Sequence, residues 1–107
     1  MNPRHGEVWL ADLGIAGKTR PVVILMADDL TAPRTLIIYI PITSQSRGGE
    51  LEVPLGHLTF LDPASLANVQ AIGALPRVRF ERRLGGLGSA DLLAIKKAVI
   101  KGCALLS

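Results

Sequence analysis

The first forty residues alternate between short apolar runs and turn-forming segments, a pattern typical of β-strands. The runs that predict strands lie at residues 7–12, 21–26 and 35–40. They are rich in β-branched residues and too short for helices of their own. The run at 21–26 is apolar at every position, so the sequence predicts a strand that is buried on both faces.

The middle of the chain continues with strands and loops. Pro41 is expected to end strand pairing because it has no backbone N–H, and a polar loop should follow over residues 43–49. Residues 50–55 alternate with period two, which predicts a half-exposed strand. Residues 65–75 should hold one or two further strands, and residues 77–83 a short helical or irregular basic connector.

The last segment changes its period and predicts an amphipathic helix. Its apolar positions recur at helical spacing, at Leu92, Ile95, Val99 and Leu106. Ser89 is a candidate N-cap, and lysines occupy the opposite face. Five or more short strands followed by one helix predict a mainly β fold of the α+β type, a small, strongly curved sheet or barrel with the C-terminal helix packed on it.

Composition changes this picture in one respect, the oligomeric state. The chain has 107 residues, of which 49% are hydrophobic and 20% charged, which predicts a single folded domain over residues 1–107 and excludes a disordered tail. The mean hydropathy of +0.37 is high for so small a soluble protein. Some apolar side chains should therefore lie in a subunit interface, and we expect a homodimer.

Sequence features also bear on location and cofactors. Charged residues near the N-terminus argue against a signal peptide. The longest uncharged stretch, residues 63–76, is shorter than the roughly 20 residues that a membrane helix needs, so we expect a cytoplasmic protein without membrane contact. The one cysteine, Cys103, excludes an internal disulfide and a thiolate zinc site. We expect no metal site and no cofactor.

The charge balance is uneven along the chain. The formal net charge is +3, and residues 61–107 carry seven basic side chains against three acidic ones. A basic patch attracts polyanions such as nucleic acid, but a solvated surface explains the same charges. Charge alone leaves both interpretations open.

Two segments bring guanidinium and hydroxyl groups to the edges of predicted strands. In the first, Lys18-Thr19-Arg20-Pro21, the proline favours an extended backbone at Arg20. The guanidinium of Arg20 therefore projects from a backbone position that is conformationally restricted. Arginine can bind a phosphate through two parallel hydrogen bonds. The second segment, residues 41–48, contains the donors Thr43, Ser44, Gln45, Ser46 and Arg47. Glycine-rich phosphate loops, metal-ligand spacings and nucleophile elbows are absent from the sequence.

Taken in order, three segments resemble one protein family. Residues 4–13 (RHGEVWLADL), 20–24 (RPVVI) and 41–48 (PITSQSRG) are similar to the corresponding segments of MazF/PemK-type toxins, which belong to bacterial toxin–antitoxin pairs. Residues 84–87 and the terminal helix also have counterparts in that family. The resemblance therefore covers essentially the whole chain.

This resemblance implies a fold, an activity and partners. The fold would be an SH3-like β-barrel that forms a homodimer, and the activity metal-independent cleavage of single-stranded RNA at short sequences. The resemblance assigns catalysis to Arg20 and Thr43. It implies RNA contacts for Lys18, Thr19, Ser44, Gln45, Ser46, Arg47 and Gln70. A cognate antitoxin, with an acidic amphipathic tail that folds on binding, would be the protein partner.

The sequence departs from the family pattern in two places. The loop at residues 14–19 is short and basic, whereas that of the family is commonly longer and acidic. A Gln-Ile-Arg sequence followed by Asp in a later strand is matched only by Gln70. The general base is therefore unassigned, with His57 and His5 as candidates. Two alternatives remain, a non-catalytic toxin that poisons a protein target such as DNA gyrase, and a barrel that only binds nucleic acid.

Overall fold

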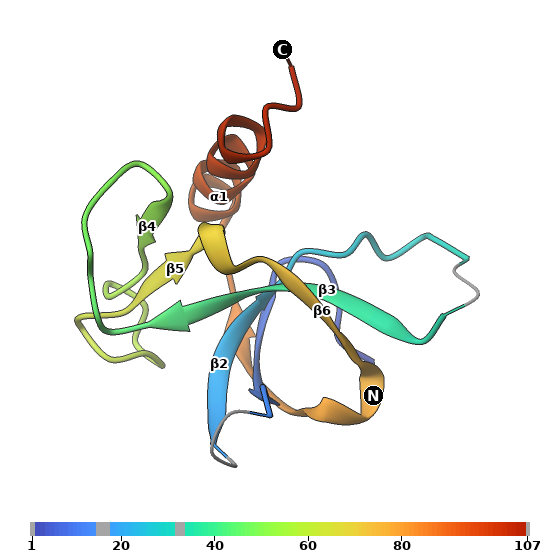
Figure 1. The fold of residues 1–107 in the computed structure, drawn as a ribbon. Helices are drawn as coiled ribbons and strands as arrows, with labels where there is room; N and C mark the ends of the chain where they lie inside the picture. The colour runs from blue at the N-terminus through green and yellow to red at the C-terminus, as the bar shows by residue number, and fades with distance from the viewer. Residues whose placement is uncertain (1, 15–17, 32–33, 107) are drawn as a thin grey trace.

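A computed structural model describes residues 2–14, 18–31 and 34–106. Figure 1 shows a strongly curved sheet with a single α-helix at one end. The strands are β1 (Glu7–Asp12), β2 (Thr19–Ile24), β3 (Leu36–Thr43), β4 (Glu52–Pro54), β5 (Leu66–Asn68), β6 (Gly73–Pro76) and β7 (Phe80–Gly86). Short 3-10 turns, η1 (Val69–Ala71) and η2 (Arg77–Arg79), lie before β6 and β7, and α1 (Ser89–Gly102) follows. The predicted mainly β fold with a C-terminal helix is confirmed.

All strand pairs are antiparallel, and β3 is the strand on which the sheet is organised. The sheet has the order β4-β5-β3-β2-β1-β7, and β6 also pairs with β3. Along one edge β3 pairs with β2; along the other it pairs first with β6, as far as Tyr39, and then with β5, from Ile42 onward. β3 therefore joins β2, β1 and β7 on one side to β6, β5 and β4 on the other.

Two hydrophobic clusters lie on opposite faces of the sheet. One contains Val23 together with Ile40 and the helical residue Ile95, and the other contains Val22 with Trp9. Val22 and Val23 are both 0% exposed, so β2 is buried on both faces, as predicted. Residues of this same chain cover both faces of β2. The full burial of β2 therefore gives no support to a subunit interface.

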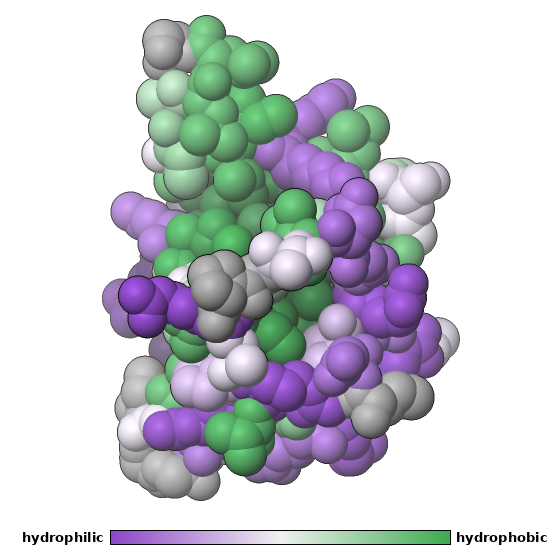
Figure 2. All heavy atoms as spheres, turned by 90° about the vertical axis from the view of Figure 1, so that its right-hand side faces the viewer, coloured by the Kyte–Doolittle hydropathy of each residue, from purple (hydrophilic) through white to green (hydrophobic). Residues whose placement is uncertain are grey.

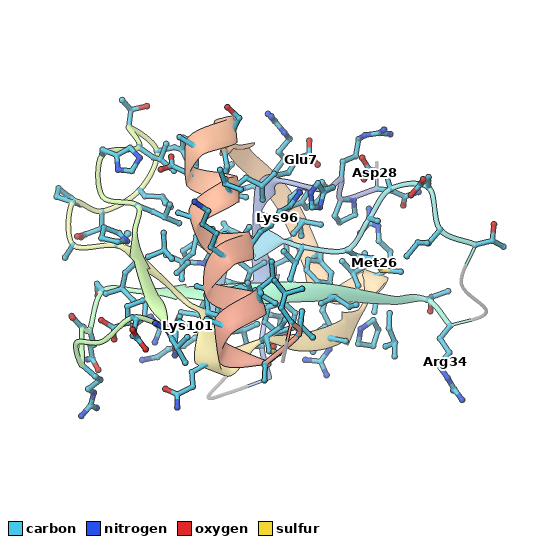
Figure 3. The ribbon with its side chains drawn as sticks, turned by 90° about the horizontal axis from the view of Figure 1, so that it is seen from above. Glu7, Met26, Asp28, Arg34, Lys96 and Lys101 are labelled. Atoms are coloured by element: carbon cyan, nitrogen blue, oxygen red, sulfur yellow. The ribbon has the colours of Figure 1, made fainter. Side chains whose placement is uncertain are left out.

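Helix α1 packs its apolar side on the first cluster through Ile95 and Ala98. On the face shown in Figure 2, hydrophobic side chains gather over the helix and below it, and Figure 3 shows α1 crossing over β3. Gly88, not Ser89, is the N-cap, and the helix ends at Gly102, so the expected helical position at Leu106 is wrong. No helix in the described ranges is long and apolar enough to span a membrane.

The sequence patterns failed at two strand positions. Pro41 does not end pairing, because β3 continues to Thr43. Pro41 lies where β3 changes partner from β6 to β5, a point at which no N–H is needed on that edge. The expected connector at 77–83 is a 3-10 turn only as far as Arg79, and strand β7 follows. Pairing with β1 at the other end of the chain stabilises β7, and no local pattern could reveal it.

Most of the basic run at 77–83 is occupied within the chain. Three of its four arginines have partners: Arg77 lies 5.5 Å from the Trp9 ring centroid, Arg79 pairs with Asp12 at 3.5 Å, and Arg83 pairs with Glu7 at 2.6 Å. These contacts tie β7 and η2 to β1. The run therefore serves mainly the fold, and only Arg82 lines a surface hollow.

Glu7 joins three segments through its carboxylate, which gives a test of stability. It accepts hydrogen bonds from the Arg4 N–H (2.7 Å), the Trp9 indole N–H (3.0 Å) and the Arg83 guanidinium (2.6 Å). Partial burial opposes ionisation, but these bonds outweigh it and lower the pKa of Glu7 below 4.5. We expect Glu7→Gln to reduce the free energy of unfolding at pH 7 by about 1–2 kcal/mol.

The pH dependence of that loss identifies its cause. Because the folded-state pKa of Glu7 is lowered, the stabilisation is present above about pH 4.5 and is lost as pH falls through the folded-state value. Urea unfolding at several pH values should show wild type and Glu7→Gln converging in acid, with the exposed Glu81→Gln as control. An equal difference at pH 7 and pH 3 would contradict this account.

Candidate functional site

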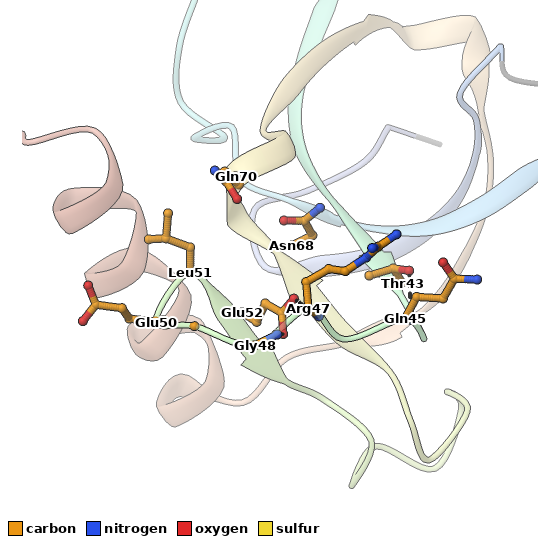
Figure 4. Close-up of a pocket in the computed structure, with 10 residues that line it drawn as sticks. Thr43, Gln45, Arg47, Gly48, Glu50, Leu51, Glu52, Asn68 and Gln70 are labelled. Carbon is orange, nitrogen blue, oxygen red and sulfur yellow. Dashed lines mark hydrogen bonds between the residues drawn. The ribbon is translucent and has the colours of Figure 1, made fainter.

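Two adjoining surface hollows lie at the end of β3. The first, about 500 Å³, is lined by the loop after β3 and by β5 and η1, with side chains that include Thr43, Gln45, Arg47, Glu52, Asn68 and Gln70 (Figure 4). The second, about 580 Å³, is lined by β1, β2, β3, β7 and the loop at 60–65, and includes Arg20 and Arg82. Thr43 and Gln45 line both hollows. The two hollows therefore form one continuous candidate site.

Strand register brings the two predicted catalytic residues together. β2 and β3 pair as Val22↔Pro41, Val23↔Ile40 and Ile24↔Tyr39. The ladder ends at Val22↔Pro41, and Arg20 and Thr43 are the residues two positions beyond that last pair on their strands. Side chains at opposite positions of an antiparallel pair lie on the same face, with Cβ atoms about 5 Å apart. Arg20 and Thr43 accordingly line the same hollow, the second of the two.

Thr43 also has a local role in the loop that follows it. Its half-buried hydroxyl oxygen accepts a hydrogen bond from the Gln45 N–H at 3.2 Å, closing a turn at the strand end. The hydroxyl proton stays available to donate to another acceptor. Thr43 therefore supports the loop backbone, and this role is compatible with donation of its proton into the hollow.

The rest of this loop is held by one carboxylate. Glu52 accepts hydrogen bonds from the Ser46 hydroxyl (2.7 Å) and from the backbone N–H groups of Arg47 (2.8 Å) and Gly48 (3.1 Å). The hydrogen bond from the Arg47 N–H, followed by that from the Ser46 hydroxyl, lowers the pKa of Glu52. Glu52 is therefore ionised at neutral pH, and the positive charge of Arg47, which lines the same hollow, also favours its ionised form.

The predicted site residues are only partly brought together. Thr43, Gln45, Arg47 and Gln70 line the first hollow, and Arg20, Thr43, Ser44 and Gln45 line the second. Ser46 bonds to Glu52. Lys18 and Thr19 are exposed at the start of β2 and line neither hollow. The predicted short basic loop at 14–19 falls partly on residues 15–17, which lie outside the described residues.

Comparison with known proteins identifies the family. The model of the family described as PemK-like, MazF-like toxin of type II toxin–antitoxin system matches residues 4–102. The chain belongs to this toxin family. It is therefore a MazF-like toxin and, by homology, an endoribonuclease. The resemblance recognised in the sequence is confirmed.

Individual relatives agree with this assignment. A probable endoribonuclease MazF2 from Mycobacterium tuberculosis is 31% identical over 90 residues, which cover 83% of this chain and 86% of the relative. The solved toxin MazF-mt6 from M. tuberculosis has a TM-score of 0.80 at 26% identity, over 92% of this chain and 96% of that one. A mycobacterial endoribonuclease solved with its cognate antitoxin has a TM-score of 0.84 at 21% identity, covering 98% of each chain, and shows the shared fold.

The histidines of this MazF-like toxin lie away from the two hollows. His57 Nε2 is 2.8 Å from Asp91 in the first turn of α1, and His5 Nδ1 is 2.9 Å from the carbonyl oxygen of Leu25. Neither residue lines a hollow. The lining of the two hollows therefore gives no support to either histidine as general base. Among the described residues there is no group of three or more His, Cys, Asp or Glu suited to a metal ion.

Sequence reasoning missed several polar lining residues of the toxin's hollows, among them Arg82, Glu52 and Asn68. Arg82 lies opposite Leu10 in the β1–β7 register, which connects the two ends of the chain. Glu52 and Asn68 lie opposite each other across β4 and β5, a pairing that the sequence did not reveal. Phe60 also lines the second hollow, and its ring packs on Gly85, where a Cβ atom would lie 2.5 Å from that ring.

Proposed function

We propose that this MazF-like toxin cleaves single-stranded RNA at short sequences without a metal ion. The ribose 2′-oxygen attacks the adjacent phosphorus and loses its proton to a base, and the bond from phosphorus to the 5′-oxygen breaks. The products are a 2′,3′-cyclic phosphate and a 5′-hydroxyl that takes up a proton. The observation that supports this best is the meeting of Arg20 and Thr43 at neighbouring strand ends that line one hollow.

The two side chains suit the charge that develops in this reaction. Negative charge grows on the phosphorane oxygens, and a fixed guanidinium stabilises it through two parallel hydrogen bonds. Arg20 supplies that group, and Thr43 orients the phosphate with its hydroxyl proton. Because the attacking atom is the 2′-oxygen, DNA is not a substrate.

The surrounding predicted residues would bind the RNA strand. Gln45 and Gln70, with neutral amides at the first hollow, suit base edges, while Arg47 suits a phosphate. Ser44 adds a hydroxyl at the second hollow. Lys18 and Thr19 at the start of β2, and Ser46 in the loop, would extend the contact along the backbone. We also propose a cognate antitoxin whose acidic, partly apolar tail pairs with the arginines and apolar walls of these hollows.

The test is incubation of the purified protein with a long RNA in EDTA, followed by mapping of the product ends. We expect cleavage at a short recurring sequence, with 5′-hydroxyl and cyclic phosphate ends, at the same rate with and without the chelator. A preparation that binds RNA without cutting it would favour a binding barrel instead. Intact, unbound RNA would favour a toxin that acts on a protein target.

We further propose a homodimer formed through an apolar strip on β3. Residues two apart on a strand share a face. From the buried Ile40 the strip continues to Ile38 and Leu36, which are 40% and 38% exposed. Apolar side chains gathered in this way are typical of subunit interfaces.

Charge placed in this strip should separate the subunits. We expect Ile38→Lys to weaken dimerisation about 100-fold, because a charge must be desolvated in an apolar interface. Light scattering at micromolar concentration measures the change. Val78→Lys, at an exposed apolar residue (82%) in η2, is the matched control and should stay dimeric. A monomeric wild type would overturn this proposal.

A further inference from the structure

The loop at residues 44–49 connects Thr43 to β4 and carries Arg47 into the candidate site. Every residue in it is exposed. Gly48 and Gly49 have φ values of +78° and +108°, and a Cβ atom at either would contact nothing within 4 Å. The loop therefore has little packing of its own, and its glycines allow it many backbone conformations.

The hydrogen bonds of this loop converge on Glu52. Within the described residues, the side chains outside the loop that bond to it are Thr43, at Gln45, and Glu52, at the Ser46 hydroxyl and the N–H groups of Arg47 and Gly48. Bonds to an ionised acceptor are shorter and stronger than bonds between neutral groups. Glu52 is thus the main restraint on the part of the loop that contains Arg47.

We propose that Glu52 is a positioning residue, which orders the 44–49 loop and so directs Arg47 toward the RNA beside Thr43. This inference rests on the proposed RNA cleavage. Figure 4 shows the Arg47 side chain running from the loop toward Thr43, with Glu52 behind the loop backbone. Arg47 lines the first hollow, and its backbone N–H is 2.8 Å from Glu52.

A carboxylate beside an RNA site has two opposite effects. Its charge repels phosphate, so removing it would strengthen RNA binding if repulsion dominated. Its three hydrogen bonds fix the loop, so removing it would weaken binding if positioning dominated. We infer that positioning dominates, because the carboxylate oxygens are occupied by donors from the loop and because solvent screens its repulsion.

The first experiment compares Glu52→Gln with Glu50→Gln. Both changes remove one negative charge near the first hollow. Glu50, however, pairs with Lys101 and does not bond to the loop residues that Glu52 holds. We expect Glu52→Gln to lower kcat/KM for RNA about tenfold, mainly through a higher KM, because small misplacements of binding groups are costly. Glu50→Gln should change it by less than about twofold. Equal effects of the two changes, or faster cleavage by Glu52→Gln, would overturn the proposal.

The second experiment needs no RNA and so separates this inference from the proposed function. Trypsin cuts after arginine, and the Arg47–Gly48 bond lies in the restrained loop. We expect that bond to be cut several-fold faster in folded Glu52→Gln than in wild type and Glu50→Gln. Faster trypsin cleavage without any RNA cleavage in wild type would refute the ribonuclease and leave the loop restraint standing. Unchanged trypsin cleavage would refute the restraint.

A double-mutant cycle tests whether Ser46 affects cleavage through its hydrogen bond to Glu52. If Ser46 acts through Glu52, Ser46→Ala should lower kcat/KM in the wild-type background and have no further effect in Glu52→Gln. Ser46→Ala removes one of the three bonds to Glu52 and also the bond from the Gly48 N–H to the Ser46 hydroxyl (3.2 Å). Because it keeps the carboxylate, it also carries the test if Glu52→Gln does not fold. The proposal predicts faster trypsin cleavage at Arg47 in Ser46→Ala as well. Additive effects of the two changes would show that Ser46 contacts RNA independently.

Discussion

Arg20→Ala is expected to lower the rate of RNA cleavage by about 10²–10³-fold while the fold stays intact. The guanidinium of Arg20 is exposed, and none of the described residues pairs with it, so its removal leaves no orphaned partner. Arg20→Lys should restore little, because a point charge does not reproduce two parallel hydrogen bonds. Single-turnover cleavage and thermal unfolding, measured on the same preparations, check both statements.

The control for Arg20→Ala is another exposed arginine. Arg34 lies at the far end of the molecule from the candidate site, next to the start of β3 (Figure 3). Arg34→Ala removes the same charge and should cleave within about twofold of wild type, since distant surface charges are screened. Near-normal cleavage by Arg20→Ala would remove the proposed mechanism.

Thr43→Val is expected to slow cleavage about 100-fold with RNA binding little changed, because it deletes a preorganised donor but keeps the shape of the side chain. It also removes the acceptor for the Gln45 N–H. That bond is exposed and 3.2 Å long, so we expect a stability loss of only about 0.5–1 kcal/mol. Rapid-quench kinetics would measure the chemical step, and urea unfolding the stability.

Thr43→Ser is the matched control because it keeps the hydroxyl and loses the methyl group. We expect it to cleave within a few-fold of wild type. If Thr43 served only to close the turn, Thr43→Val would lose cleavage and stability in parallel, and conditions that restore the folded fraction would restore activity. A folded Thr43→Val that cuts RNA at the wild-type rate would exclude a catalytic role.

The sequence predicted elements where burial follows a local pattern. The bounds of β1 agree with the predicted 7–12, and two-sided burial of β2 was visible in its unbroken apolar run. β2 nevertheless begins at Thr19, two residues earlier than the apolar run, because Thr19 and Arg20 pair with Asp12 and Ala11. Pairing between strands, not hydrophobicity, determines where such a strand begins.

The same distinction applies to the site. Thr43, Gln45 and Arg47 were predictable because they share one polar loop that follows an apolar run. Glu52 and Asn68 join the hollow through the register between β4 and β5, and only the folded chain brings them to the loop. The sequence identified the donors of the site, but it did not identify Glu52 as the acceptor that holds their loop.

The partners of β3 also determine when the site can exist during synthesis. Its ladders with β5 and β6 need residues translated well after Thr43, and β1 closes the barrel only with β7, where Glu7 meets Gly86. Contacts between such distant segments form only when the entropic cost of closing the intervening loop has been overcome. A nascent chain on the ribosome therefore contains Arg20 and Thr43 long before they belong to an assembled site. Nearly the whole chain must therefore be synthesised before the candidate site can form.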